Sequence, residues 1–127
     1  MIIDAHTHIH LDPDAEGQTA QDLLRSMDEV GVEKAAVFAA PINMLSTEAV
    51  LREIYGHRDR LFAVGSVSPI IRAYHRPVGW IEKWLDTGSI RAIKFYTGYE
   101  HFYPADERLR PYLELLVKYD RPVIFHC

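Results

Sequence analysis

Histidines lie near both ends of this 127-residue sequence, in each case beside a short apolar run. The chain opens with MIIDAHTHIH, where His6 and His8 are two residues apart, and the last apolar run is followed by His126. Neutral imidazole nitrogens are preferred ligands of zinc and other borderline divalent ions. Three of them around one ion would leave a position open for a water molecule, which the ion would activate. These residues therefore predict a divalent metal site, with zinc as the expected ion.

The first apolar run is predicted to be a strand, in which alternate side chains share a face. Asp4 then lies on the same face as His6 and His8. Ile3 and Ala5 are expected on the opposite face, packed against helices. From its position Asp4 is a candidate to orient one imidazole through a hydrogen bond.

Two later apolar runs place further polar side chains at the corresponding strand ends. In IRAIKFY, Lys94 and Tyr96 share one face, opposite Ile93 and Phe95. In VIFH, the same parity turns His126 inward. If the apolar faces pack against helices, Lys94 and His126 point inward near the carboxyl ends of their strands. Parallel α/β barrels build their active sites at that end.

Each of these residues also has an ordinary structural interpretation. A pair of histidines after a strand can belong to an exposed loop, and His10 is predicted to lie beyond the site. His126 alone could be a buried core histidine, and Lys94 could extend to solvent or pair with a carboxylate. Shared parity and placement at the strand ends favour the metal site over these separate explanations.

Five β-rich runs alternate with segments of helical spacing. They begin near Ile2, Lys34, Leu61, Ile90 and Pro122. Strands joined by single helices imply right-handed crossovers and a parallel sheet covered by helices. A closed barrel and an open doubly wound sheet both satisfy this order, but HTHIHLDPDAEG after the first run lacks the glycine-rich phosphate loop of the open sheet. We therefore predict an α/β fold of the (β/α)8 TIM-barrel type, present as an incomplete barrel of about five parallel strands and four helices.

Capping residues predict where the helices begin and end. Thr19 is expected to cap the first helix and Gly31 to end it. The second is predicted from Ser46 to about Tyr55, the third begins after Pro77, and Asp106 is expected to cap the fourth. The predicted buried stripes comprise Ala20, Leu23, Leu24, Met27 and Val30 in the first helix and Leu109, Leu113, Leu116 and Val117 in the fourth.

Composition narrows the functional class. With 48% hydrophobic residues, residues 1–127 are expected to form one core and to belong to a single domain. The net charge of −4 is spread along the chain, so neither nucleic acid nor an anionic membrane is an expected partner. No apolar stretch approaches the roughly 20 residues that span a bilayer. One cysteine, Cys127, and an opening without signal-peptide features favour a cytoplasmic protein.

Taken in order, several motifs resemble the amidohydrolase superfamily, in particular its amidohydrolase-related branch of metal-dependent TIM-barrel hydrolases and decarboxylases. IIDAHTHIH resembles the Asp-x-His-x-His signature of the first strand in that group. HRDRLFAVGSVSP is similar to its third-strand segment, and the stretch from IRAIKFY to VIFHC is similar to its fourth strand, helix and fifth strand. The resemblance covers nearly the whole chain.

This resemblance implies that His6 and His8 are first-strand metal ligands and that His126 is the ligand on the fifth strand. Lys94 then occupies a fourth-strand position where some relatives carry a carboxylated lysine bridging two metal ions and others make no metal contact. The same lysine disfavours a TatD-like nuclease, in which a glutamate is more usual near this position.

The family pattern continues with a histidine after the sixth strand and an aspartate after the eighth, which serves as proton acceptor. Both are expected beyond Cys127, so the catalytic residues themselves are not identified within this chain. We accordingly expect the N-terminal portion of a single metal-dependent hydrolase domain. Self-association into a homo-oligomer or the missing C-terminal half would complete the sheet.

The leading functional hypothesis is a metal-dependent hydrolase that uses a metal-activated water on a small carbonyl or carboxylate substrate, or a non-oxidative decarboxylase. Substrate contacts are predicted at Tyr96, Tyr99 and His101 after the fourth run and at Arg72 after the third. The same residues could instead pack over the rim or be solvated. A competing hypothesis is a non-catalytic fragment that binds metal weakly or only self-associates. A nucleotide-binding open sheet lacks its phosphate loop.

Overall fold

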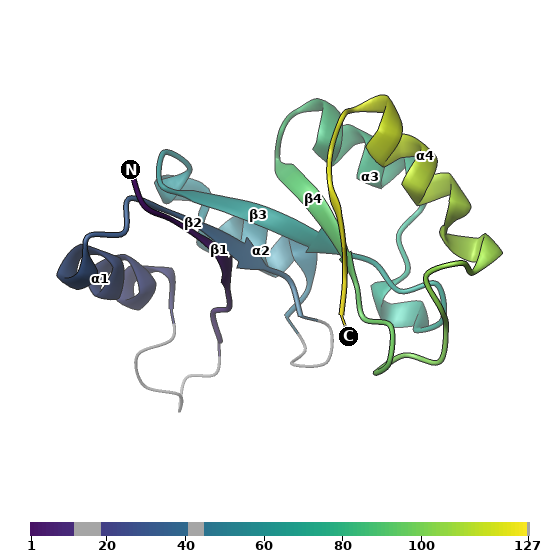
Figure 1. The fold of residues 1–127 in the computed structure, drawn as a ribbon, viewed down its shortest axis with the longest axis horizontal. Helices are drawn as coiled ribbons and strands as arrows, with labels where there is room; N and C mark the ends of the chain where they lie inside the picture. The colour runs from purple at the N-terminus through teal and green to yellow at the C-terminus, as the bar shows by residue number, and fades with distance from the viewer. Residues whose placement is uncertain (12–18, 41–44, 127) are drawn as a thin grey trace. The chain divides into compact units, whose positions relative to one another are not determined.

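The computed structural model describes residues 1–11, 19–40 and 45–126 (Figure 1), so Cys127 lies outside the described residues. These residues form five strands and four α-helices in the alternating order that the sequence predicts. Along the sheet the strands follow chain order, β1-β2-β3-β4-β5. The chain divides into two compact units, Met1–Ala63 and Val64–Cys127, and each is described by itself.

The first unit is built around β2, a short apolar strand. Its elements are β1 (Ile3–Thr7), α1 (Ala20–Val30), β2 (Lys34–Phe38), α2 (Thr47–Glu53), the 3-10 helix η2 (Tyr55–His57) and the start of β3 (Leu61–Ser66). All of β2 except Lys34 is buried, and β1 pairs with it in parallel. α2 begins next to Ser46, as predicted, and the Ser46 side chain caps it. The predicted helical segment continues beyond α2 as η2.

β1 departs from regular alternation. Its register against β2 shifts by one residue between Asp4 and Thr7, an irregularity that re-aims side chains locally. The prediction that Ile3 and Ala5 pack against helices is wrong, since both are exposed. β1 lies at the edge of the strand order and has a strand neighbour on one side only, so less of its surface is covered.

Local signals define both ends of α1 as predicted. The Thr19 side chain accepts a hydrogen bond from the backbone N–H of Asp22, whose carboxylate accepts one from the Thr19 N–H. This reciprocal capping box satisfies donors that have no partner inside the helix. Gly31 ends α1 with φ of 75°, a left-handed conformation that glycine adopts without steric cost. Val30, predicted to be buried, is exposed because it precedes this turn at the end of the helix.

The second unit packs two helices with the last two strands. It contains the end of β3, the 3-10 helix η3 (Arg72–Tyr74), α3 (Val78–Asp86), β4 (Ile90–Phe95), the 3-10 helix η4 (Glu107–Leu109), α4 (Arg110–Lys118) and β5 (Val123–Phe125). β4 and β5 pair in parallel, with Lys94 opposite Ile124 and Phe95 opposite Phe125. The third helix begins directly after Pro77, as predicted.

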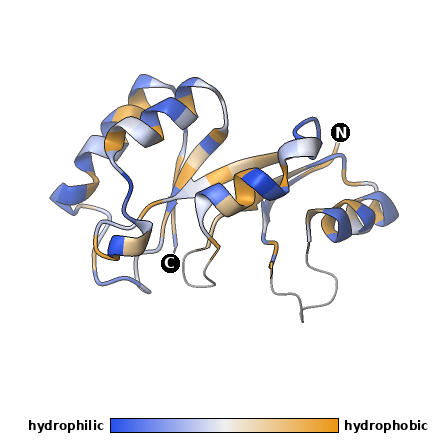
Figure 2. Cartoon of the chain, turned by 180° about the vertical axis from the view of Figure 1, so that it is seen from behind, coloured by the Kyte–Doolittle hydropathy of each residue, from blue (hydrophilic) through white to orange (hydrophobic). Residues whose placement is uncertain are grey.

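Phe95 is the centre of the core of the second unit. Its fully buried ring contacts Phe102 after β4, Tyr112 on α4 and Phe125 on β5. Further buried apolar side chains from α3 and β4 are Ile81, Leu85, Ile90 and Ile93. Figure 2 shows apolar residues concentrated on the strands, whereas the helices carry both apolar and polar residues. This core fixes β4 and β5, the strands that lead to Lys94 and His126.

The fourth helix differs from its prediction in its cap and in part of its buried face. Asp106 caps η4 rather than α4, accepting from the backbone and guanidinium of Arg108, which lowers the pKa of Asp106 to about 2. Leu109 and Leu116 are buried as predicted, but the buried residues between them are Tyr112 and Leu115, and Leu113 is only partly buried. Val117, predicted to be buried, is 82% exposed.

Candidate functional site

His6 and His8 come together at the carboxyl end of β1. Their Nε2 atoms are 3.1 Å apart, and both rings lie beside the ring of Phe38 at the end of β2. Thr7, between them, is held by a hydrogen bond of 2.8 Å from its hydroxyl to the carbonyl of Ala36. The prediction that these two imidazoles share a face is therefore confirmed by their contact.

The spacing of the two imidazoles fits ligands of one ion. Two nitrogens bound at about 2.0–2.1 Å to a tetrahedral zinc ion would be about 3.3 Å apart. The separation of 3.1 Å is close to that value. Asp4 was predicted to orient one imidazole through a hydrogen bond. Instead, its Oδ1 accepts a hydrogen bond of 3.0 Å from the backbone N–H of His6. This contact stabilises the backbone beneath the pair.

In the second unit, His126 is anchored by its backbone. Its N–H donates to the carbonyl of Phe95 at 2.9 Å, and its carbonyl accepts from the hydroxyl of Thr97 at 2.7 Å. Its ring is stacked against Tyr96, with centroids 5.8 Å apart, and lies 4.6 Å from the ring of Tyr99. The imidazole is thus held between main-chain bonds and two aromatic rings.

Lys94 is a buried lysine on β4, the strand that pairs with β5. The residue is only 2% exposed, and its Nζ lies 4.9 Å from the ring centroid of Tyr96. A buried ammonium is costly unless its surroundings compensate it, and a phenol face attracts a cation. Tyr96 therefore contacts both Lys94 and His126, and burial together with the charge of Glu100 raises the pKa of its phenol.

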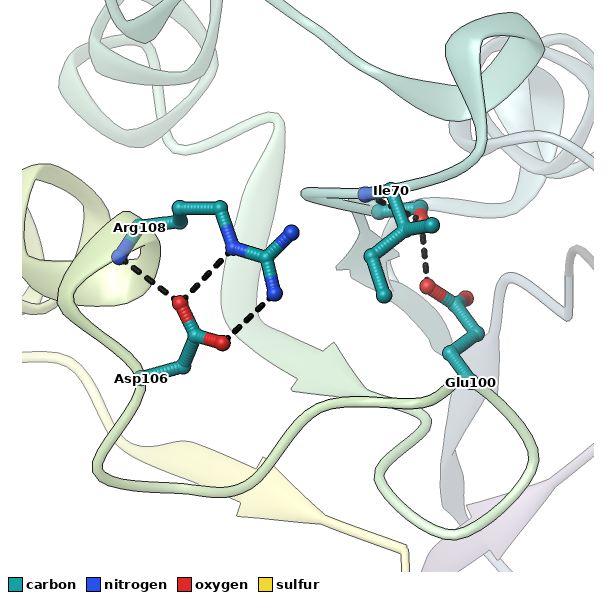
Figure 3. A network of polar contacts seen from close by, with 5 residues as sticks. Ile70, Glu100, Asp106 and Arg108 are labelled. Atoms are coloured by element: carbon teal, nitrogen blue, oxygen red, sulfur yellow. Dashed lines mark hydrogen bonds and ion pairs between the residues drawn. The ribbon is translucent and has the colours of Figure 1, made fainter.

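Ser68 and Glu100 form a buried pair that the sequence did not predict. Ser68 follows β3 and is fully buried, while Glu100 follows β4 and is 7% exposed. The Ser68 hydroxyl donates a hydrogen bond to Oε2 of Glu100. Figure 3 shows the Glu100 carboxylate facing the loop after β3, which contains Ser68 and Ile70. Burial raises the pKa of Glu100, and the serine hydrogen bond opposes part of that rise. No sequence motif relates a serine and a glutamate that are 32 residues apart. The position of Ser68 shortly after a predicted strand was the one feature that could have drawn attention to it.

A cavity of about 660 Å³ lies next to His126 and Glu100. Its wall is the segment after β4, which is rich in aromatic and polar groups: Thr97, Gly98, Tyr99, Glu100, His101, Phe102, Tyr103 and Pro104. Two predicted substrate residues, Tyr99 and His101, line this cavity. A third, Tyr96, is not among the described lining residues, but its ring stacks on that of His126. Arg72 is an exposed residue of η3 and is not among the described residues that line it.

The described residues do not place three metal-ligating side chains around one point. Over residues 1–11, 19–40 and 45–126, no group of three or more histidine, cysteine, aspartate or glutamate side chains is close enough to hold a metal ion. The first unit supplies the His6 and His8 pair, and the second supplies Lys94 and His126. The predicted site that combines all four remains a prediction.

The pH dependence of stability provides a test of the Glu100 environment. Because burial raises the pKa of Glu100, the folded chain keeps its proton to a higher pH than the unfolded chain does. The free energy of unfolding should therefore fall as the pH rises from the ordinary glutamate pKa of 4.5 to the raised value. Glu100→Gln should lack this fall when urea denaturation is measured between about pH 4.5 and 8. Parallel curves for the two proteins would contradict it, and Glu114→Gln, at an exposed position, is the matched control.

Comparison with known proteins identifies the class of protein. The family model described as amidohydrolase matches residues 3–127. The chain therefore belongs to the amidohydrolase family, as its motifs predict. A search of curated proteins found no match.

Solved structures of similar fold come from hydrolases and decarboxylases. A probable 2-pyrone-4,6-dicarboxylic acid hydrolase from Acinetobacter baumannii, with citric acid bound, is 18% identical with a TM-score of 0.73, covering 99% of this chain and 49% of that chain. A 5-carboxyvanillate decarboxylase from Novosphingobium aromaticivorans, with manganese and 3-methoxy-4-hydroxy-5-nitrobenzoic acid bound, is 14% identical with a TM-score of 0.70, covering 99% and 50%. The corresponding enzyme from Sphingomonas paucimobilis is 13% identical with a TM-score of 0.66, covering 98% and 51%.

These comparisons confirm the fold class. The chain spans about half the length of each of these structures. The five strands and four α-helices that the described residues form, in alternating order, are those expected of an incomplete TIM barrel. Among the described residues, no helix combines the length and apolar character needed to cross a membrane.

Proposed function

We propose that this chain is the N-terminal portion, residues 1–127, of a metal-dependent hydrolase or non-oxidative decarboxylase acting on a small carbonyl or carboxylate substrate. The observation that carries the proposal is the pair of imidazole nitrogens 3.1 Å apart at the end of β1, in a chain that belongs to the amidohydrolase family. Two of the similar structures are decarboxylases and one is a probable hydrolase, which supports the same reaction classes.

Imidazole nitrogens are donors that suit a divalent ion. His6, His8 and His126 would hold it through imidazole nitrogens, and Lys94 is proposed as a fourth contact. A nitrogen-rich donor set favours zinc, whereas one similar decarboxylase contains manganese. When bound, such an ion supplies Lewis acidity toward a substrate carbonyl and lowers the pKa of a water molecule.

The cavity beside His126 is the proposed substrate site. Tyr99 and His101 line it and can bind a polar or planar substrate group. The ring of Tyr96 stacks on the imidazole of His126. Arg72, exposed after β3, is proposed as a contact for a substrate carboxylate. We further propose that the protein is cytoplasmic. We also propose that the chain associates with a second copy of itself or with the C-terminal half of the barrel.

Metal content measured on the purified chain tests this function. Elemental analysis after dialysis against zinc or manganese should give about one or two ions per chain. Fewer than about 0.1 ion per chain with both metals would contradict the proposal. Intact mass on the same sample reports whether the polypeptide is longer than residues 1–127. Light scattering reports whether it associates with further copies of itself.

A second candidate is a chain that binds metal weakly or only self-associates. It is favoured by one observation, that the described residues bring no three ligating side chains together. The same measurement separates the two, because a self-associating fragment would be a defined oligomer with no bound metal. Tight binding of at least one ion per chain supports the enzyme.

A further inference from the structure

The loops that follow β3 and β4 are joined by one buried hydrogen bond. Ser68, fully buried, donates from its hydroxyl to Oε2 of Glu100 (Figure 3). The same hydroxyl oxygen accepts from the backbone N–H groups of Ile70 at 3.1 Å and Ile71 at 2.7 Å. The serine is therefore fixed to its own loop as well as to the glutamate.

The direction of this hydrogen bond is determined by the serine. A hydroxyl has one proton and two acceptor lone pairs. Both lone pairs are occupied by the N–H groups of Ile70 and Ile71, so the proton is directed at Glu100. A carboxyl group accepts such a bond whether it is ionised or protonated. The pair thus persists across the pH range.

Glu100 connects this pair to the cavity wall. Its backbone N–H donates to the carbonyl of Tyr96 at 2.9 Å and closes a turn that contains Gly98, at φ of 91°, and Tyr99. Tyr99 is the residue next to Glu100, and its ring lies 4.6 Å from the ring of His126. Anchoring the Glu100 side chain therefore limits where the Tyr99 ring can lie.

We propose that Ser68 and Glu100 are positioning residues, which hold the turn after β4 so that Tyr99 packs on His126 and sets the orientation of its imidazole. The inference rests on the proposed function only in taking His126 as a metal ligand. Groups that orient a ligating histidine typically change metal affinity by about 10–100-fold when they are removed. A Ser68 and Glu100 pair that served the core alone would leave the imidazole of His126 unchanged.

The test compares four variants of the full chain by two measurements. The first is the set of His126 imidazole NMR signals in the metal-free chain, and the second is zinc affinity by competition with a chromophoric chelator. Ser68→Ala should shift the His126 signals and weaken zinc binding by about 10–100-fold. Glu100→Gln keeps an acceptor oxygen for Ser68, so both readouts should remain close to those of the parent chain. Glu114→Gln is the exposed control.

Tyr99→Leu is the second route to the same result, because Tyr99 is 57% exposed and its replacement leaves the buried pair intact. It should shift the His126 signals even if Ser68→Ala fails to fold. Unchanged His126 signals in Tyr99→Leu, or in folded Ser68→Ala, would overturn the proposal. If the parent chain binds no zinc, the proposed function fails, but the NMR comparison still decides whether Ser68 and Tyr99 position His126.

Discussion

Replacing His6 or His8 with alanine is expected to weaken metal binding by more than about 100-fold, since removing even a group that supports a ligand costs about 10–100-fold. The two Nε2 atoms lie 3.1 Å apart, so each variant removes one of two adjacent donors to the proposed ion. Zinc affinity, measured by competition with a chelator of known strength, checks this result. The two losses should not add in the double variant, because either one already breaks the pair.

His10→Ala is the matched control for these variants. His10 is the same residue type two positions beyond His8, and it is predicted to lie outside the site. Its zinc affinity should stay within about 3-fold of the parent value, well inside a single ligand effect. A loss in His10→Ala equal to that in His6→Ala would mean that zinc binds the histidines of this segment without a defined site.

Signals that act over a few residues were predictable from the sequence. Thr19 and Asp22 cap α1 with groups three residues apart, and Gly31 ends it because its φ of 75° suits glycine. The contact of His6 with His8 follows from strand alternation over two residues. In each case, the residues that decide the conformation are neighbours in the chain.

Features that depend on phase or on distant contacts were predicted less well. Val117 is exposed because Tyr112, Leu115 and Leu116 form the buried face of α4, and residue spacing alone did not separate this face from that of Leu113 and Val117. The exposure of Ile3 depends on which elements cover β1. The alternation of side chains along a strand predicts which face Ile3 lies on, but not whether that face is covered. Ser68 and Glu100 meet across 32 residues through burial of both loops, and no spacing rule relates them.

Family membership was predictable because several motifs occur in the right order, whereas a single His-x-His would have been weak evidence. The combination of His6, His8, Lys94 and His126 in one site goes further than alternation supports. Parity gives the face of each strand on which a side chain lies, but ligand distances of about 2 Å depend on strand twist and register. The β1 register shift between Asp4 and Thr7 is one such local change.

Phe95→Ala is expected to lower the free energy of unfolding by about 3–5 kcal/mol, the range found when a fully buried phenylalanine is truncated. The Phe95 ring contacts Phe102, Tyr112 and Phe125, so its loss leaves a cavity bordered by the loop after β4, α4 and β5. Urea denaturation at 25 °C measures the change. Tyr103→Ala removes an aromatic ring that is 81% exposed, and its unfolding free energy should change by less than about 0.5 kcal/mol.

Phe95 also links stability to the candidate site, because its carbonyl accepts the hydrogen bond from the His126 N–H at 2.9 Å. Phe95→Leu keeps most of the apolar volume and should cost less than half as much stability as Phe95→Ala, since the cavity that remains is smaller. Its zinc affinity should stay close to that of the parent chain, because the backbone bond to His126 does not depend on the ring. Equal losses of stability in Phe95→Ala and Tyr103→Ala would show that the aromatic cluster is not the core of this unit.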